Sequence, residues 1–230
     1  MKNKIKIDFA FNFQIDSDEI RNFYKKNWSN DIILANKNFY KWNFIENPSN
    51  SKKDYNCIAV SQSNKILGIM GLSRRDFFLE KKKISGAELT TWVLDKNFRG
   101  KGLGKNMLVF LKKKFDVLIG SGITDEAKKV YLLNGFSFVK HIPRFFKIYK
   151  RDNMDNFIKI KDYADNLFDN QEITEIESTK SYKFENISNK NSLIEDSTLK
   201  KKSNLFSKSK KWLIWRYLKH PFFKYFIYCI

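Results

Sequence analysis

The N-terminal part of the chain combines an alternating apolar pattern with a helical one. Apolar side chains alternate with other residues over residues 5–11, which predicts a strand. Asp16 followed three residues later by Glu19 is typical of a helix N-terminus, and apolar residues then recur at helical spacing. A second helix is expected over residues 38–45. It should end before Pro48, because the residue before a proline is disfavoured in helical backbone.

Extended segments dominate the next part of the chain. Residues 55–60 and 66–72 are apolar runs that we expect to pair as a hairpin. Three charged residues at positions 74–76 interrupt the pattern; they are interpreted as a loop in preference to residues that line an acceptor cleft. A further strand is expected over residues 84–94, which are rich in β-branched and aromatic side chains.

Helices and strands then alternate as far as residue 149. The expected elements are a helix with apolar residues over 107–115, a strand over 116–119, a helix over 127–134, and strands over 136–141 and 145–149. Gly135 stands where a glycine commonly ends a helix. The predicted order is therefore strand, two helices, three strands, helix, strand, helix and two strands.

A basic, glycine-rich turn separates the strand over 84–94 from the next helix. It reads Arg99-Gly100-Lys101-Gly102-Leu103-Gly104-Lys105. The first amides of a helix lack internal partners and carry partial positive charge, and glycines let a ligand approach the backbone closely. With the added cations, the turn is suited to binding a pyrophosphate.

Two common phosphate-binding motifs do not fit this turn. A P-loop needs Ser or Thr after the Gly-Lys pair, and Asn106 stands there. The dinucleotide-binding fingerprint needs a small residue at its third glycine position. That position is Lys105 or Met107, depending on which glycine begins the motif.

Two motifs instead resemble those of the GNAT (Gcn5-related) N-acetyltransferase superfamily. Arg99-x-x-Gly102-x-Gly104 after a strand resembles the acyl-CoA-binding motif of that family, although the preceding spacer lacks the proline often found there. Residues 127–136, a helix that carries Tyr131 and ends in Gly-Phe, look like its second signature. The resemblance covers residues 1–150. It implies an α/β (α+β) GNAT fold, with a mixed, mostly antiparallel twisted sheet and flanking helices.

The resemblance also assigns roles to individual residues. It implies acetyl-CoA as co-substrate, a backbone amide at the end of the strand that faces the thioester oxygen, Tyr131 as general acid and Glu88 as a base acting through water. Alternation places Glu88, Thr90 and Trp92 on one face of the strand. The expected cofactor-binding residues are Trp92, Val93, Leu94, Arg99, Gly100, Lys101, Gly102, Leu103, Gly104 and Lys105.

Composition narrows the class of protein. The formal net charge is +19, but the lysines are spread along the chain without the interleaved aromatic residues of a nucleic-acid platform, so nucleic acid is not favoured as a partner. The two cysteines and two histidines form no metal-ligand pattern, and we expect no metal. Cysteine usage suits the cytoplasm, and no apolar run is long enough to span a membrane.

The part after residue 150 differs in composition and contains a repeat. Polar residues dominate residues 151–203, but Trp215-Arg216-Tyr217-Leu218-Lys219-His220-Pro221 echoes Trp42-Asn43-Phe44-Ile45-Glu46-Asn47-Pro48. We interpret residues 151–230 as a linker and an incomplete second GNAT-like repeat that begins near residue 165. Its aromatic residues need cover from the first domain or from another subunit, as in a homodimer.

Three functions remain open from the sequence. The first is acetyl-CoA-dependent acylation of a small-molecule amine such as a nucleotide-linked amino sugar, suggested by the similarity of the Trp-x-aromatic-x-x-x-Pro region to GNAT proteins of surface-polysaccharide pathways. The second is an aminoacyl-tRNA-dependent peptidyltransferase, since such enzymes contain tandem GNAT-like domains. The third is a non-catalytic module that binds CoA.

Overall fold

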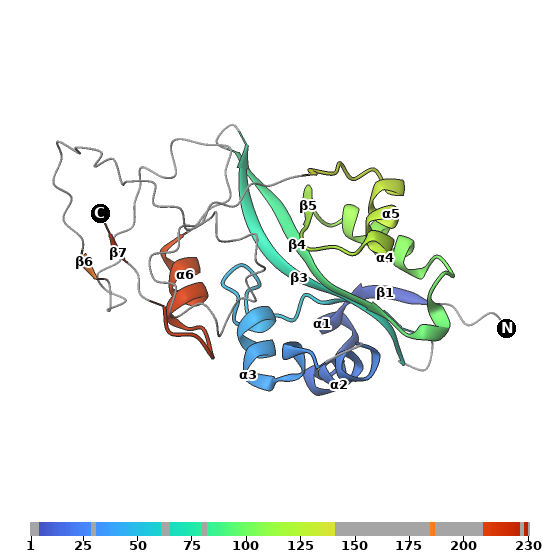
Figure 1. Ribbon diagram of the computed structural model, residues 1–230, viewed down its shortest axis with the longest axis horizontal. Coiled ribbons are helices and arrows are strands. Elements are labelled where there is room, and N and C mark those ends of the chain that lie inside the picture. Colours follow the sequence, from blue (N-terminus) through green and yellow to red (C-terminus); the bar gives the residue numbers. More distant parts are fainter. Residues whose placement is uncertain are drawn as a thin grey trace, which may run out of the picture. The chain divides into compact units, whose positions relative to one another are not determined.

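The computed structural model describes residues 5–28, 31–60, 65–79, 82–140, 185–186, 209–225 and 228–229. The chain divides into two compact units, one made of Met1–Phe136 with Glu185–Cys229 and the other essentially of Ser137–Phe184. All the helices and strands that the structure describes belong to the first unit (Figure 1). The strands predicted over 136–141 and 145–149 have no counterpart at residues 136–140, and their other residues lie outside the described part.

A five-stranded mixed sheet forms the centre of this unit. Neighbouring strands are antiparallel except β4 and β5, which are parallel. The strands, in both sequence and spatial order, are β1 (Lys6–Phe9), β2 (Cys57–Val60), β3 (Ile66–Leu79), β4 (Lys82–Leu94) and β5 (Val117–Gly120). A separate two-stranded sheet pairs β6 (Glu185–Asn186) with β7 (Tyr228–Cys229).

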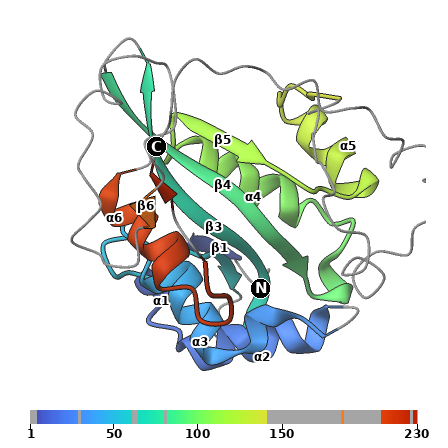
Figure 2. The same cartoon turned by 60° about the vertical axis from the view of Figure 1, so that its left-hand side comes forward.

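Helices cover both faces of the five-stranded sheet (Figures 1 and 2). One face carries α1 (Ala10–Phe13), α2 (Ser17–Asn27), the 3₁₀-helix η1 (Ile33–Ala35), α3 (Lys37–Tyr40) and the π-helix η2 (Lys41–Ile45). The other carries α4 (Leu103–Lys112), with α5 (Asp125–Leu133) beside it. A further pair, α6 (Lys210–Leu213) and the π-helix η8 (Ile214–Leu218), contacts η2.

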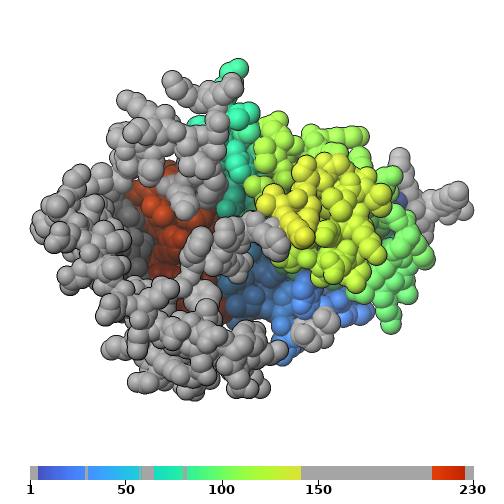
Figure 3. Space-filling view, turned by 45° about the horizontal axis from the view of Figure 1, so that its top comes forward, coloured from blue at the N-terminus to red at the C-terminus, as the bar shows by residue number. Residues whose placement is uncertain are grey.

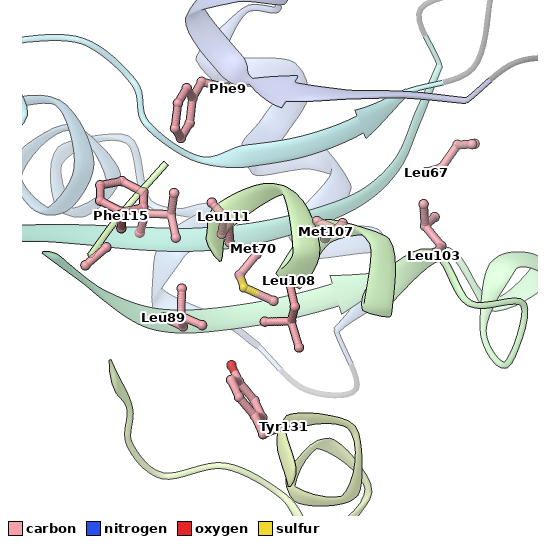
Figure 4. Packing of buried hydrophobic residues seen from close by; sticks show 12 residues of the cluster. Phe9, Leu67, Met70, Leu89, Leu103, Met107, Leu108, Leu111, Phe115 and Tyr131 are labelled. Carbon is pink, nitrogen blue, oxygen red and sulfur yellow. The ribbon is translucent and has the colours of Figure 1, made fainter. Parts of the chain in front are cut away.

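Local sequence explains where these helices begin and what they bury. The Asp16 carboxylate accepts a hydrogen bond from the Asp18 amide and caps α2, as its position in the sequence predicts. In α4, apolar residues at helical spacing lie against β3 and β4, and Met107, Leu108 and Leu111 are fully buried (Figure 4). These contacts fix the start of α4 beside the end of β4.

A bulge in β4 changes which side chains share a face. Met70 of β3 pairs with Trp92 and Leu72 pairs with Leu89, so two residues of β3 span three residues of β4. Leu89 and Trp92 therefore both pack on the α4 side, while Val93 packs on the α2 side. The expectation that Glu88 and Trp92 lie on one face is wrong, because the extra residue reverses the alternation between them.

The loop predicted at residues 74–76 is also wrong. Arg74, Arg75 and Asp76 belong to β3, which pairs with β4 as far as Leu79. All three side chains have partners: Arg75 pairs with Glu88 and Asp76 with Lys83 across the hairpin, and Arg74 lies over the ring of Tyr55, which precedes β2. Polar residues on a partly exposed hairpin thus give the sequence signal of a loop.

Candidate active site

Strands β4 and β5 diverge next to the candidate site. They pair only where Gly86–Leu89 face Val117–Gly120, and β4 then continues to Leu94 alongside β3 alone. The divergence leaves the main chain of Trp92–Leu94 without a β5 partner. These three residues line a cavity, as expected for the end of the strand that would face a thioester.

The glycine-rich turn connects this strand to α4 in the geometry that its sequence predicts. The Asp95 carboxylate accepts a hydrogen bond of 2.9 Å from the Asn97 amide and caps the short 3₁₀-helix η3 (Lys96–Phe98). Gly100 and Gly102 then have φ angles of 71° and 77°, a left-handed conformation that favours glycine. Helix α4 begins at Leu103, so its first amides lie at the turn and favour an anion there.

A cavity of about 1150 Å³ opens between the turn, the end of α2 and helix α5. Its lining is cationic, with four Lys and Arg side chains against one carboxylate, that of Glu126. The lining residues are Lys26, Asn27, Trp28, Trp92, Val93, Leu94, Lys96, Arg99, Gly100, Gly102, Leu103, Gly104, Lys105, Thr124, Glu126, Ala127, Val130, Leu133 and Asn134. All the cofactor-binding residues expected from the sequence line it except Lys101.

Several lining residues could not be expected from the sequence. Those of α2 and of the loop before α5 belong to no recognisable motif, and they reach the cavity only through tertiary packing. The most prominent is Trp28, an exposed aromatic side chain directly after α2. An exposed Trp beside a cationic cavity indicates a ligand-binding surface, but only the structure reveals that Trp28 is exposed.

The packing of Trp92 explains why position 104 of the turn is a glycine. A Cβ atom added to Gly104 would lie 2.3 Å from Cζ2 of the Trp92 indole, so no larger residue fits there without moving the ring. The indole Nε1 is buried and has no hydrogen-bond partner among the described residues. A buried donor of this kind is uncommon in folded proteins, and here it accompanies the close packing of the indole against α4.

Tyr131 lies between α5 and β4 and points toward the sheet (Figure 4). It is only 4% exposed and makes edge-to-face contacts with the rings of Trp92 and Phe136, at 5.6 and 4.8 Å. Burial raises the pKa of Tyr131 to about 12, so the phenol keeps its proton at neutral pH. It does not itself line the cavity, but its neighbour Val130 does.

Glu88 lies away from the cavity, with its charge matched. Its carboxylate forms an ion pair with Arg75 and accepts a hydrogen bond of 2.7 Å from Oγ of Ser121. The two charged side chains are 21% and 28% exposed, so the pair is largely sheltered from water. The structure thus places the turn and Trp92–Leu94 at the cavity and Tyr131 behind them, against the Trp92 ring, but leaves Glu88 on the other face of β4.

Strands that diverge beside a glycine turn, with helices on both faces of a mixed sheet, make this the GNAT fold. Residues 17–120 match the model of the acetyltransferase (GNAT) family. The matched residues include the glycine turn and end with β5, so Tyr131 lies beyond them. No curated protein sequence matches the chain significantly.

Solved structures of acetyltransferases resemble the chain at low identity. Glucosamine-6-phosphate N-acetyltransferase from Arabidopsis thaliana is 19% identical, over 64% of this chain and 99% of its own, with a TM-score of 0.45. An acetyltransferase from Trypanosoma brucei is 14% identical, over 62% and 99%, with a TM-score of 0.42.

Two further observations concern the described residues alone. Within them, no cluster of three His, Cys, Asp or Glu side chains could hold a metal ion. None of the helices found there has the length and apolar character needed to cross a bilayer.

Proposed function

We propose that the chain is an acyl-CoA-dependent N-acyltransferase that transfers an acetyl group from acetyl-CoA to a primary amine. One observation carries the proposal: the turn Arg99–Lys105 opens a helix directly beside a cationic cavity into which the end of β4 leads. The cavity suits a large anionic co-substrate in volume and charge.

Each group of site residues would have a separate role in acetyl transfer. Amides at the start of α4, with Arg99 and Lys105, would bind the pyrophosphate and so orient the thioester, which supplies an activated acyl group. Main-chain groups of Trp92–Leu94 would stabilise negative charge on the thioester oxygen. Tyr131, protonated at neutral pH, would donate its proton to the departing sulfur.

Glu88 would accept the proton of the acceptor amine through water. Arg75 and Ser121 hold its carboxylate in place on the face of β4 that α2 and α3 cover. This assignment places the acceptor on the opposite side of the strand from the coenzyme. The two substrates would then meet where β4 diverges from β5.

The acceptor we propose is a small-molecule amine, and in particular an amino sugar on a nucleotide carrier. The formal net charge of +19 suits a phosphate-bearing substrate. The Trp-x-aromatic-x-x-x-Pro region resembles GNAT proteins that modify surface polysaccharides. We further propose that the enzyme acts in the cytoplasm, and that it could act as a homodimer.

A tandem GNAT protein of the peptidyltransferase type is the second candidate. It is favoured by the C-terminal element α6–η8, which would belong to a second GNAT-like repeat that begins near residue 165. The glycine turn argues against it, because a transferase that uses aminoacyl-tRNA needs no pyrophosphate site. A non-catalytic CoA-binding module would keep the turn and lack turnover.

Thermal unfolding with acetyl-CoA, followed by a CoA-release assay with a panel of amines, separates the three candidates. The acyltransferase is expected to gain several degrees in melting temperature at saturating acetyl-CoA and to release CoA with at least one amine. A shift without release would identify a binding module. The absence of any shift would overturn the proposed CoA site and favour the peptidyltransferase.

A further inference from the structure

The C-terminal element repeats the element formed by α3 and η2 in structure as well as in sequence. Each consists of a four-residue α-helix that continues into a five-residue π-helix. Asn36 and Ser209 cap the two α-helices, and each side chain accepts from the amide three residues later. π-Helices are rare in proteins, so their recurrence at matching positions is a specific similarity.

The two elements contact each other through their equivalent tryptophans. Nε1 of Trp42 donates a 2.8 Å hydrogen bond to the main-chain oxygen of Trp215, and Nε1 of Trp215 donates a 2.7 Å bond to that of Trp42. The indoles are stacked with centroids 5.1 Å apart, and they are only 2% and 5% exposed. Figure 3 shows the C-terminal element (red) beside the N-terminal helices (blue).

Reciprocal bonds of this kind are what a two-fold axis produces. In an isologous interface, residue i of one partner contacts residue j of the other and residue j contacts residue i. Here the partners are residues 173 apart in one chain. We infer that the Trp42 face of α3 and η2 is a self-recognition surface, and that its partner is the repeated element, residues 209–225, of the same chain.

Side chains around the tryptophans explain why this partner fits better than α3 and η2 of a second copy. The Arg216 guanidinium lies 5.4 Å from the Trp42 ring centre, and the His220 ring lies 4.4 Å from it. The equivalents of Arg216 and His220 in the first element are Asn43 and Asn47, which can provide neither contact. The surface therefore selects the C-terminal element over its own copy.

The contact also bears on the proposed homodimer. With Trp42 and Trp215 buried against each other, this face is already occupied and is not available to a second subunit. The inference does not depend on the proposed enzymatic activity, because it rests on the two elements alone.

The test uses the full chain and three single variants, Trp42→Phe, Trp215→Phe and the control Trp28→Phe. Stacked indoles give an exciton couplet in far-ultraviolet circular dichroism. Either variant is expected to remove the contribution of the Trp42–Trp215 stack to this couplet, while the contact of Trp212 with Trp215 remains in Trp42→Phe. Each is also expected to lower the melting temperature by about 5 °C, because each leaves one buried carbonyl without its donor. Trp28 is 39% exposed, and its replacement should leave the couplet intact.

A double variant and a mixing experiment complete the test. Because the two bonds form one contact, the loss in Trp42→Phe/Trp215→Phe should be smaller than the sum of the single losses. Additive losses, or a couplet that survives in Trp215→Phe, would overturn the inference. Mixing the two single variants should not restore the couplet, and restoration would show that the partner element comes from another copy.

Discussion

The charges on the two sides of β4 are used differently. On the side of the glycine turn, Arg99, Lys101 and Lys105 form no ion pair with a described residue, and Arg99 and Lys105 line the cavity beside the N-terminus of α4. On the other side, Glu88 and Arg75 pair with each other. Cations that form no ion pair favour binding of an external anion, whereas a carboxylate paired with a guanidinium is held in one position. The contrast separates a surface with excess positive charge from one whose charges are matched within the protein.

The largest expected effect comes from placing a negative charge in the turn. Gly102→Glu should weaken CoA binding about 100-fold or more, because the carboxylate repels the pyrophosphate and the φ angle of 77° disfavours a side chain. Isothermal titration calorimetry measures the affinity. Gly122→Glu is the matched control, since Gly122 also has a positive φ, 63°, with open space around it, and does not line the cavity. Equal losses in both variants would contradict a local anion site.

The next effect concerns the proton donor on the coenzyme side. Tyr131→Phe should lower kcat about 100-fold with little change in the KM for acetyl-CoA, because the phenol acts after binding. The pKa of about 12 means that the wild-type acid stays protonated until pH approaches that value, so the deficit should persist across neutral and mildly alkaline pH. Steady-state rates over that range check this. Tyr55→Phe, away from the cavity, should be unaffected, and full turnover in Tyr131→Phe would exclude the proposed role.

The smallest effect should come from the paired side. Glu88→Gln should reduce kcat/KM for the amine about tenfold, while CoA affinity stays unchanged. Glu126→Gln provides the opposite case, because Glu126 lines the cavity proposed for CoA. This variant should leave kcat/KM for the amine unchanged and should strengthen CoA binding slightly, because it removes a negative charge near the anionic ligand. Kinetics with both substrates varied distinguish the two. A loss of CoA affinity in Glu88→Gln would contradict the proposal that CoA and the amine bind on opposite faces of β4.

Much of the fold follows from patterns that act over short distances. The helix beginning at Asp16, the strand before the turn and the left-handed glycines all depend on neighbours in sequence, and the structure has them as predicted. The conformation of the glycine turn could be predicted for the same reason. A turn carries its own dihedral requirements and charges, wherever the rest of the chain lies.

The other side of the site depends on facts that a local pattern does not contain. Alternation alone places Glu88 with Trp92, and only the register against β3 reveals the bulge that separates them. In the sequence, a charged residue such as Arg75 is typical of a loop, and only the structure shows that it pairs with Glu88 across two strands. The demand for glycine at position 104 likewise comes from an indole that lies far away in sequence. Partners distant in sequence made each of these residues difficult to interpret.

The bulge in β4 has a consequence for how this segment can change over time. Substitutions keep the number of residues between Leu89 and Trp92, so each side chain keeps its orientation. Deletion of one of the two intervening threonines would turn every later side chain of the strand over, sending Trp92 to the α2 side and Val93 to the α4 side. The number of residues between Leu89 and Trp92, and not only their chemical character, therefore decides which side chains face the cavity.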